Sequence, residues 1–430
     1  MTSKDQTTFV IIGAGAAGLM AARELARAGK RVIVLEARER CGGRIESLPV
    51  EAFGYPAEGG AEFVHGASPL TRSLMREAGL RLAPSAGQGW RAVDGELSPS
   101  EGPMPHAARL HEALSRLKTD LPVAEFLAEH FAEPQYAELR RSVTRMVEGF
   151  DAADPSRAST FALREEWMGR GLGQQGRIAE GYGALISFLA SDCRRQGVTI
   201  QHGAVVNAID AKRRGIVVGC RDGALVDADA AILTVPLPLL ADIAMPAKAR
   251  AARTQVASDI GFGNVIKILL RFATRWWTTG GGRNLAGMSF VFSSAPVPTW
   301  WTQHPALHPV LTGWLAGPRA DAAAGLAEHD IVEMGIRSLA EIFTVPADRL
   351  KEMLVASRAI NWGSDPFARG AYSYATPRTR EAQSRSAMPE LGVFFSGEAF
   401  YAGPEMGTVE AALASGHETA RRIIANGSRC

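Results

Sequence analysis

The sequence predicts an α/β fold of two domains, and three observations support this prediction. A glycine-rich turn joins an apolar strand to a helix near the N-terminus. A second group of glycines lies between a buried strand and a helix near the C-terminus. The chain also has 430 residues, which is more than one ordinary core accommodates, because domains typically span about 100–200 residues.

The N-terminal unit begins with an apolar strand over residues 9–12 and continues into the glycine turn of GAGAAGL. Apolar residues then recur at helical spacing, and a second strand over 31–35 ends at Glu36. In such a unit Gly13 makes the tight turn, Gly15 lets the backbone approach a pyrophosphate, and Gly18 lets helix and strand pack closely. The helix N-terminus suits phosphate, and Glu36 suits the hydroxyls of a ribose. This unit predicts a Rossmann-like dinucleotide-binding domain.

The segment CGGR, residues 41–44, favours FAD over NAD, a choice that the glycine turn alone leaves open. Two glycines and Arg44, directly after the second strand, can enclose a pyrophosphate from its far side. In this spacing they resemble flavoproteins of the glutathione-reductase-like superfamily, and amine oxidases in particular.

The C-terminal block predicts a buried strand over 393–396, then Gly397 and Glu398, and a helix with Thr408 as a good N-cap. One interpretation is an amphipathic helix that only closes the domain. That explains the apolar stripe but not the SGE segment or Gly407 at the helix start. The other interpretation is that the helix N-terminus points at a flavin ring, because a helix dipole stabilises the negative charge of the reduced form.

The chain resembles the flavin-containing monoamine and polyamine oxidase family nearly end to end. The segments that carry the resemblance are, in the expected order, GAGAAGL, LEARERCGGR, ADAAILTVPLPLL, NWGSDPFARGAYSY and SGEAFYAGPEMGTVEAALASG. The resemblance implies bound FAD and a discontinuous, glutathione-reductase-like FAD-binding domain over 1–85, 197–242 and 385–430. An interleaved α+β substrate-binding domain would span 86–196 and 243–384.

The resemblance also implies which residues contact FAD. Glu398 would hold a hydroxyl of the ribityl chain, the backbone of Val206 would touch the adenine, and Trp362 would pack on the flavin, unless it only fills the core. Ala371 stands where monoamine oxidases carry the cysteine that bonds the flavin, so FAD is expected to bind noncovalently. The expected contacts are Gly13, Gly15, Ala16, Ala17, Gly18, Glu36, Ala37, Arg38, Gly43, Arg44, Gly60, Ala61, Glu62, Phe63, Val206, Trp362, Gly397, Glu398, Gly407, Thr408 and Val409.

Lys267 stands inside the apolar run GNVIKILLRF, which predicts a strand. In a strand Val265, Lys267 and Leu269 share one face. The lysine is then either an edge-strand residue whose head reaches water or a buried functional group. The resemblance favours the second interpretation, because a family lysine in such a strand holds a water next to the flavin N(5) atom. Its charge would help dioxygen accept electrons from the reduced flavin.

His65 and Tyr372 are expected to line the substrate channel and, with Lys267, to form the catalytic set. His65 matches the histidine of the WIHG segment of polyamine oxidases, although a surface loop histidine is the alternative. Tyr372 matches one aromatic residue of the cage that holds a neutral amine. Thr408 stands where monoamine oxidases carry the second cage tyrosine, so the cage is half missing. Phe400 or Tyr401 could substitute.

The implied reaction is the oxidation of a neutral amine. A hydride would pass from the amine α-carbon to the flavin N(5), the imine would hydrolyse, and dioxygen would reoxidise the flavin to give hydrogen peroxide. His65 and Thr408 favour polyamines over simple monoamines. Glu62, Glu165 or Glu166 could bind a distal ammonium, although Glu62 alternatively contacts only the flavin. Heterocyclic and secondary amines stay open as substrates.

Three other functions of flavoproteins would require different residues from those found in this sequence. L-amino-acid oxidases of the family place an arginine where this chain has Phe63. Flavin-dependent desaturases and dehydrogenases share the glycine turn but are expected to lack the lysine beside N(5). A non-enzymatic flavin-binding module would have no need of Lys267, Trp362 and Tyr372.

Composition excludes several other classes. The net charge is +2 and the basic residues are scattered, so no nucleic-acid footprint is expected. The four cysteines lie far apart without a CxxC pair, which argues against a zinc site and a disulfide framework. No signal peptide or hydrophobic tail is visible, so the expectation is a cytoplasmic protein without a membrane segment or a metal. Members of the family are often dimers, and a homodimer is an open expectation.

Overall fold

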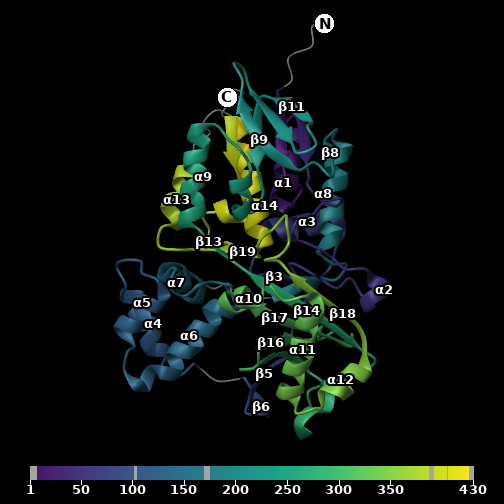
Figure 1. Ribbon diagram of the computed structural model, residues 1–430, viewed down its shortest axis with the longest axis vertical. Helices are drawn as coiled ribbons and strands as arrows, with labels where there is room; N and C mark the ends of the chain where they lie inside the picture. Colours follow the sequence, from purple (N-terminus) through teal and green to yellow (C-terminus); the bar gives the residue numbers. More distant parts are fainter. Residues whose placement is uncertain (1–6, 101–103, 169–174, 387–391, 404, 426–430) are drawn as a thin grey trace.

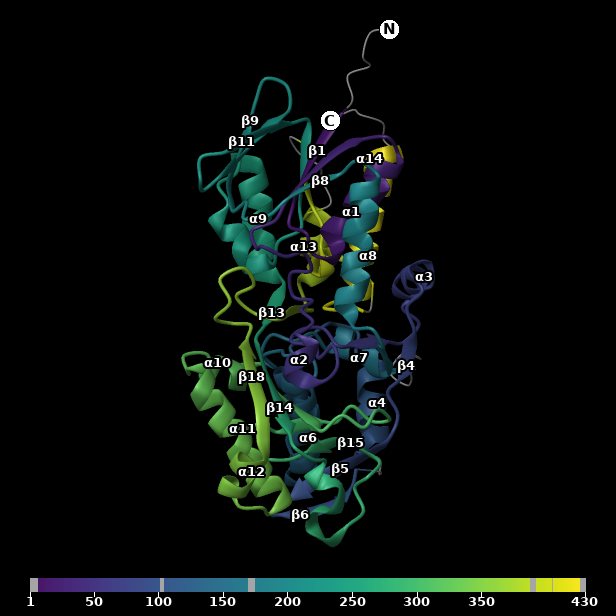
Figure 2. The same ribbon diagram turned by 90° about the vertical axis from the view of Figure 1, so that its right-hand side faces the viewer.

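The computed structural model describes residues 7–100, 104–168, 175–386, 392–403 and 405–425. The described chain forms an elongated body (Figures 1 and 2). A parallel sheet with its helices occupies one end, and a mostly antiparallel sheet with further helices occupies the other. The first strand, β1 (Thr8–Ile12), and the last helix, α14 (Val409–Ala425), both lie at the end that holds the parallel sheet.

The parallel sheet is assembled from three remote parts of the chain. Its strand order is β20-β12-β1-β2-β8, and every neighbouring pair runs parallel. The central strands are almost wholly apolar because both faces of the sheet are covered. The strands are β1 (Thr8–Ile12), β2 (Arg31–Leu35), β8 (Thr199–Gln201), β12 (Ala230–Leu233) and β20 (Val393–Phe395).

Different layers cover the two faces of this sheet. One face packs against a helical layer of α1 (Ala16–Arg27), α3 (Pro69–Ala78), α8 (Tyr182–Arg195) and α14 (Val409–Ala425). The other face packs against an antiparallel sheet of order β11-β10-β9, against η2, and against a helical pair. These elements are β9 (Val206–Ala211), β10 (Ile216–Cys220), β11 (Leu225–Ala228), η2 (Leu237–Asp242), α9 (Ala247–Asp259) and α13 (Thr379–Ser386).

The second large sheet has seven strands in the order β18-β14-β17-β16-β15-β5-β6. Helices α11 and α12 and the turn η3 pack on one face of it around a core rich in tryptophan. The elements are β5 (Gln88–Val93), β6 (Glu96–Pro99), β14 (Val265–Phe272), η3 (Trp276–Gly282), β15 (Met288–Phe292), β16 (Thr299–Trp301), β17 (Val310–Ala316), α10 (Pro318–Ala322), α11 (Glu328–Phe343), α12 (Ala347–Met353) and β18 (Leu354–Asn361).

A helical group with its own core lies beside this sheet. It contains α4 (Ala107–Arg116), α5 (Val123–His130), η1 (Pro134–Tyr136), α6 (Ala137–Gly149) and α7 (Thr160–Met168). Short elements connect the two ends of the molecule. They are α2 (Val50–Phe53), β3 (Phe63–His65), β4 (Leu82–Pro84), β7 (Gln175–Ile178), β13 (Gly261–Gly263), β19 (Tyr372–Tyr374) and η5 (Glu398–Phe400).

The predicted fold class is confirmed. The strands predicted over 9–12, 31–35 and 393–396 are β1, β2 and β20, and the helix predicted from Thr408 is α14. The predicted domain boundaries stay an expectation; α8, which they place in the substrate-binding domain, packs against α1. None of the helices in the described part of the chain is both long enough and apolar enough to cross a membrane.

Candidate active site

One continuous cavity of about 1710 Å³ runs between the two ends of the molecule. It extends from the turn between β1 and α1 to the face of the seven-stranded sheet that carries Lys267. Of the residues that the sequence predicts for cofactor binding and catalysis, all except Gly18 line this cavity. Gly18 lies behind the wall, where a Cβ atom would be 2.0 Å from the carbonyl oxygen of Gly13. Only glycine permits this contact between helix and strand, as its predicted packing role requires.

The nucleotide end of the cavity fits a dinucleotide. The Glu36 carboxylate accepts backbone N–H bonds from Ala14 at 2.7 Å and Arg38 at 2.9 Å, and these leave lone pairs toward the cavity. A Cβ atom at Gly15 would find its nearest neighbour, the Gly42 carbonyl oxygen, 3.9 Å away. The space in front of Gly15 is therefore open cavity rather than chain, and a diphosphate can approach the backbone there.

Two helices from opposite ends of the sequence begin at this cavity. The first residues of α1 and of α14 both line it. Thr408 caps α14 as predicted, since its hydroxyl oxygen accepts the Ala411 N–H at 3.1 Å. Gly416 lets α14 lie against α1, because a Cβ there would be 2.3 Å from the Ala17 carbonyl oxygen. The positive ends of both helix dipoles are thus directed at the same space.

Arg44 and Glu398, both predicted to contact FAD, are paired with each other. The guanidinium donates to Glu398 Oε1 at 2.9 Å and to the Ala371 carbonyl oxygen at 2.6 Å. The Ser373 hydroxyl also donates to Glu398, at 3.1 Å. This ion pair joins the segment after β2 to the C-terminal segment, and both side chains keep a place in the cavity wall.

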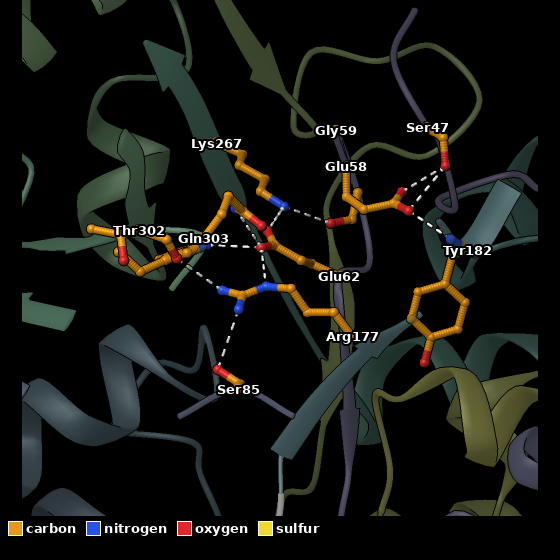
Figure 3. A network of polar contacts seen from close by, with 12 residues as sticks. Ser47, Glu58, Gly59, Glu62, Ser85, Arg177, Tyr182, Lys267, Thr302 and Gln303 are labelled. Carbon is orange, nitrogen blue, oxygen red and sulfur yellow. Dashed lines mark hydrogen bonds and ion pairs between the residues drawn. The ribbon is translucent and has the colours of Figure 1, made fainter. Parts of the chain in front are cut away.

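Lys267 lies on an internal strand, so the edge-strand interpretation is wrong. β14 pairs with β17 on one side and β18 on the other, and Lys267 is only 1% exposed. Its Nζ donates to Glu62 Oε2 at 2.7 Å and to the Gly60 carbonyl oxygen at 3.1 Å (Figure 3). It also lies 5.5 Å from the centre of the Trp301 ring. Lys267 and Val265, predicted to share one face of the strand, both line the cavity.

Glu62 is the centre of this polar network. Its Oε1 accepts from Arg177 at 2.8 Å, from Trp301 Nε1 at 3.0 Å and from Gln303 at 3.1 Å. Burial alone would raise its pKa, but the charges of Lys267 and Arg177 and these hydrogen bonds lower the pKa to about 2. The carboxylate already pairs with two cations, Lys267 and Arg177, so a distal ammonium would meet a net positive charge there and Glu62 is not open to it.

A second carboxyl pair, Asp151 and Glu166, lines the cavity near Tyr372. The two side chains share a hydrogen bond. Burial raises the pKa of Glu166 to about 7, and burial together with the neighbouring carboxyl raises the pKa of Asp151 well above its ordinary value. Glu165, the other predicted candidate, is exposed and paired with Arg380.

Aromatic side chains form the walls around Lys267. The Tyr372 hydroxyl donates to the Phe150 carbonyl oxygen at 2.6 Å, and its ring stacks on Trp314 at 6.5 Å between centroids. Trp314 also lines the cavity, whereas Phe400 and Tyr401, the predicted substitutes for the second cage residue, do not. Trp314 is therefore the aromatic residue beside Tyr372.

Two further predicted residues, Trp362 and His65, belong to the same wall. Trp362 Nε1 donates to the Gly59 carbonyl oxygen at 3.2 Å and lies next to the cavity. His65 is on β3 rather than on a surface loop, and burial lowers its pKa to about 4. The imidazole is therefore neutral at physiological pH and can exchange a hydrogen bond, but not a charge, with an amine.

Sequence reasoning missed Asp151, Arg177, Trp301 and Trp314 as members of the site. Asp151 lies two residues after the end of α6, next to Phe150, and no spacing links it to Glu166. Trp301 and Trp314 alternate with core residues on β16 and β17, so strand periodicity could have placed each on a face but not at a cavity.

Known proteins resemble this chain over nearly its whole length. Residues 16–424 match the family described as flavin containing amine oxidoreductase. Polyamine oxidase 4 of Oryza sativa subsp. japonica is 26% identical over 456 residues, which cover 97% of this chain and 89% of that protein. Putrescine oxidase bound to putrescine superposes with a TM-score of 0.77 at 23% identity, over 98% of this chain and 99% of that one.

Cyclohexylamine oxidase from Brevibacterium oxydans gives a TM-score of 0.80 at 20% identity, with 98% of this chain and 99% of that chain covered. At these identities the solved structures establish the fold, whereas the family match extends over nearly the whole sequence. The chain therefore belongs to the family of flavin-containing amine oxidoreductases and is an FAD-dependent oxidoreductase that acts on amines.

Proposed function

We propose that this enzyme oxidises aliphatic amines that carry a second cationic group, the class of diamines and polyamines. The observation that carries the proposal is the Asp151–Glu166 pair, two half-buried carboxyl groups in a wall that is otherwise largely apolar and aromatic. The names of the relatives support this class, since they include polyamine oxidases and a putrescine oxidase.

The carboxyl pair has the charge that one ammonium group needs. Two carboxyl groups that share a hydrogen bond away from bulk water keep a proton between them, so that the pair carries one negative charge when Glu166 is ionised. A distal ammonium would pair with that charge, whereas a monoamine would leave it buried and unpaired. Burying an unpaired charge is costly, so the pair should favour substrates with a second cation.

The remaining residues have roles that suit an amine oxidase. When bound, FAD takes a hydride from the amine α-carbon and passes the electrons to dioxygen, and the imine product hydrolyses. Tyr372 and Trp314 would flank the neutral amine and exclude water from it. Lys267 would present its ammonium group to the flavin side of the cavity and favour electron transfer to dioxygen. Ala371 offers no thiol, so FAD would be held noncovalently by the cradle around Glu36 and Arg44.

A substrate panel tests the proposal. Purified, FAD-saturated enzyme would be assayed for hydrogen peroxide with butane-1,4-diamine, spermidine, butylamine, cyclohexylamine and L-amino acids. We expect kcat/KM for the diamine to exceed that for butylamine, which has the same carbon chain without the second amine, by about tenfold or more. Equal or better turnover of butylamine would contradict the assignment of Asp151 and Glu166 to a second cation.

The cavity walls favour a second candidate, a hydrophobic monoamine. Phe150, Phe292 and Met146 line the cavity and are each more than a third exposed, which is unusual for large apolar residues. Cyclohexylamine as the best substrate of the panel would support this candidate. An L-amino-acid oxidase is disfavoured at the position of Phe63, because the nearby Arg177 is already bound to Glu62, Ser85 and Thr302.

Compartment and assembly belong to the proposal as well. We propose the cytoplasm as the compartment of this enzyme. A homodimer is the assembly to test, and light scattering of the purified protein distinguishes a 45.9 kDa monomer from a particle of twice that mass.

A further inference from the structure

The network around Glu62 contains two cations and one anion in a buried place (Figure 3). Lys267 and Glu62 are 1% and 5% exposed at their side chains, and Arg177 is 12% exposed. A buried anion between two cations is stable only when its geometry is well satisfied. The network faces the cavity from the strand that carries Lys267.

The Lys267 ammonium is held in one position. Two of its three N–H groups are directed at Glu62 Oε2 and at the Gly60 carbonyl oxygen, and the Trp301 ring lies 5.5 Å from the nitrogen. The third N–H forms no hydrogen bond within the described part of the chain. Since Lys267 lines the cavity, this N–H is available to a water or a bound group there.

The other oxygen of Glu62 is held just as firmly. Arg177, Trp301 and Gln303 all donate to Oε1, so that the carboxylate is anchored at one oxygen and holds the lysine with the other. Only a carboxylate can accept at both oxygens. An amide of the same shape would direct its NH₂ group either at the lysine or at the three donors.

We propose that Glu62 is the positioning residue of Lys267: it keeps the ammonium group directed into the cavity, and thereby controls how fast dioxygen reoxidises the enzyme. The proposal rests on the role given to Lys267 under the proposed function. Arg177 takes part by holding Glu62 and by leaving one net positive charge in the cavity wall. That charge would favour dioxygen as it accepts an electron.

A double-mutant cycle of E62Q and K267M tests the proposal. Anaerobic reduction by the substrate amine and reoxidation by dioxygen would be measured separately by stopped flow. We expect E62Q and K267M each to slow reoxidation by about tenfold or more while reduction changes less. If Glu62 acts through Lys267, E62Q causes no further slowing in the K267M background. Multiplied effects in the double variant would overturn the proposal.

A second readout does not depend on turnover. The chain has 7 lysines, so the side-chain ¹⁵Nζ spectrum of the ¹⁵N-lysine-labelled holoenzyme is sparse, and K267M identifies the signal of Lys267. E62Q should shift or broaden that signal. The matched control is E58Q, which removes a buried carboxyl bound to Ser47 and Tyr182 and should leave the Lys267 signal in place. An unchanged Lys267 signal in E62Q would refute the positioning role.

The reoxidation rate and the ¹⁵N signal of Lys267 together distinguish a failure of this proposal from a failure of the proposed function. If K267M reoxidises as fast as the wild type, the role of Lys267 toward dioxygen is wrong, and the ¹⁵N signal still decides whether Glu62 holds the lysine. If E62Q does not fold, E62D replaces it. A shortened carboxylate keeps the charge but cannot reach both groups of donors, so slower reoxidation and a shifted signal are expected. Wild-type behaviour of E62D in both measurements would refute the proposal.

Discussion

Replacing Glu166 by Gln should have opposite effects on stability and on substrate selection. The folded enzyme keeps the proton of this carboxyl up to a pKa of about 7, whereas the unfolded chain releases it at the ordinary value of 4.5. Ionisation of the unfolded chain therefore lowers the stability of the wild type as pH rises from 4.5 to 7, and the loss is complete above pH 7. The difference corresponds to at most about 3 kcal/mol.

Glutamine cannot ionise, so E166Q avoids this loss. We expect the variant to be more stable than the wild type at pH 8, by up to about 3 kcal/mol, and to differ by less than about 1 kcal/mol at pH 5. Substrate selection should change in the other direction. A hydrogen bond from an ammonium to a charged partner contributes about 1.5–3 kcal/mol, so kcat/KM for butane-1,4-diamine should fall about ten- to hundredfold. Butylamine should be affected little.

Two assays check these numbers. Urea unfolding in excess FAD at pH 5 and pH 8 gives the stability difference, and the peroxide-coupled assay at pH 8 gives both values of kcat/KM. E165Q is the matched control, because Glu165 is adjacent but exposed and paired with Arg380. The reasoning is refuted if E166Q loses stability at pH 8, or if it slows the diamine and butylamine equally. Either result would make Glu166 a structural residue and not part of a cation site.

Three further predictions concern the cofactor cradle and the channel. E36A should weaken FAD retention by about tenfold or more, because one carboxylate holds both the glycine turn and the expected ribose contact. The ratio of flavin to protein absorbance after dialysis measures FAD retention, and an unchanged ratio would contradict the ribose contact. G18A should yield little soluble, flavin-loaded protein, because its Cβ would lie 2.0 Å from the Gly13 carbonyl oxygen. The control G149A, whose Cβ would meet nothing of the described chain within 4 Å beyond its own helix, should behave as the wild type. A yellow, stable G18A would count against the packing argument. H65Q should leave the shape of the pH–rate profile between pH 5.5 and pH 8 unchanged, because burial already holds the pKa of His65 at about 4. If a titration in that pH range disappears in H65Q, His65 is the group that titrates there and the prediction is wrong.

The cofactor cradle could be predicted closely because its determinants are local. Gly13, Gly15, Gly18 and Glu36 act through a turn, a helix start and a strand end within 24 residues of sequence, and each of these is encoded by its neighbours. The two faces of β14 followed from alternation alone, with Val265 and Lys267 on one side.

The substrate end could be predicted only in part because its contacts are remote in sequence. Arg177 and Glu62 are 115 residues apart, and Trp301 reaches Glu62 across 239 residues. No periodicity links such residues. The resemblance supplied Tyr372 and His65. The expected substitutes Phe400 and Tyr401 do not line the cavity, whereas Trp314, which stacks on Tyr372, does.

The sequence by itself determined that this chain binds a dinucleotide, where the strands and helices of the cofactor cradle begin, and which side of β14 carries the lysine. These properties depend on steric and hydrogen-bonding preferences of neighbouring residues. Only the tertiary structure decided that Glu62 accepts from four donors, that Asp151 joins Glu166, and that Lys267 lies on an internal strand. Those outcomes depend on which strands pair and which loops meet, and the energies that select them come from packing between segments that the chain keeps far apart.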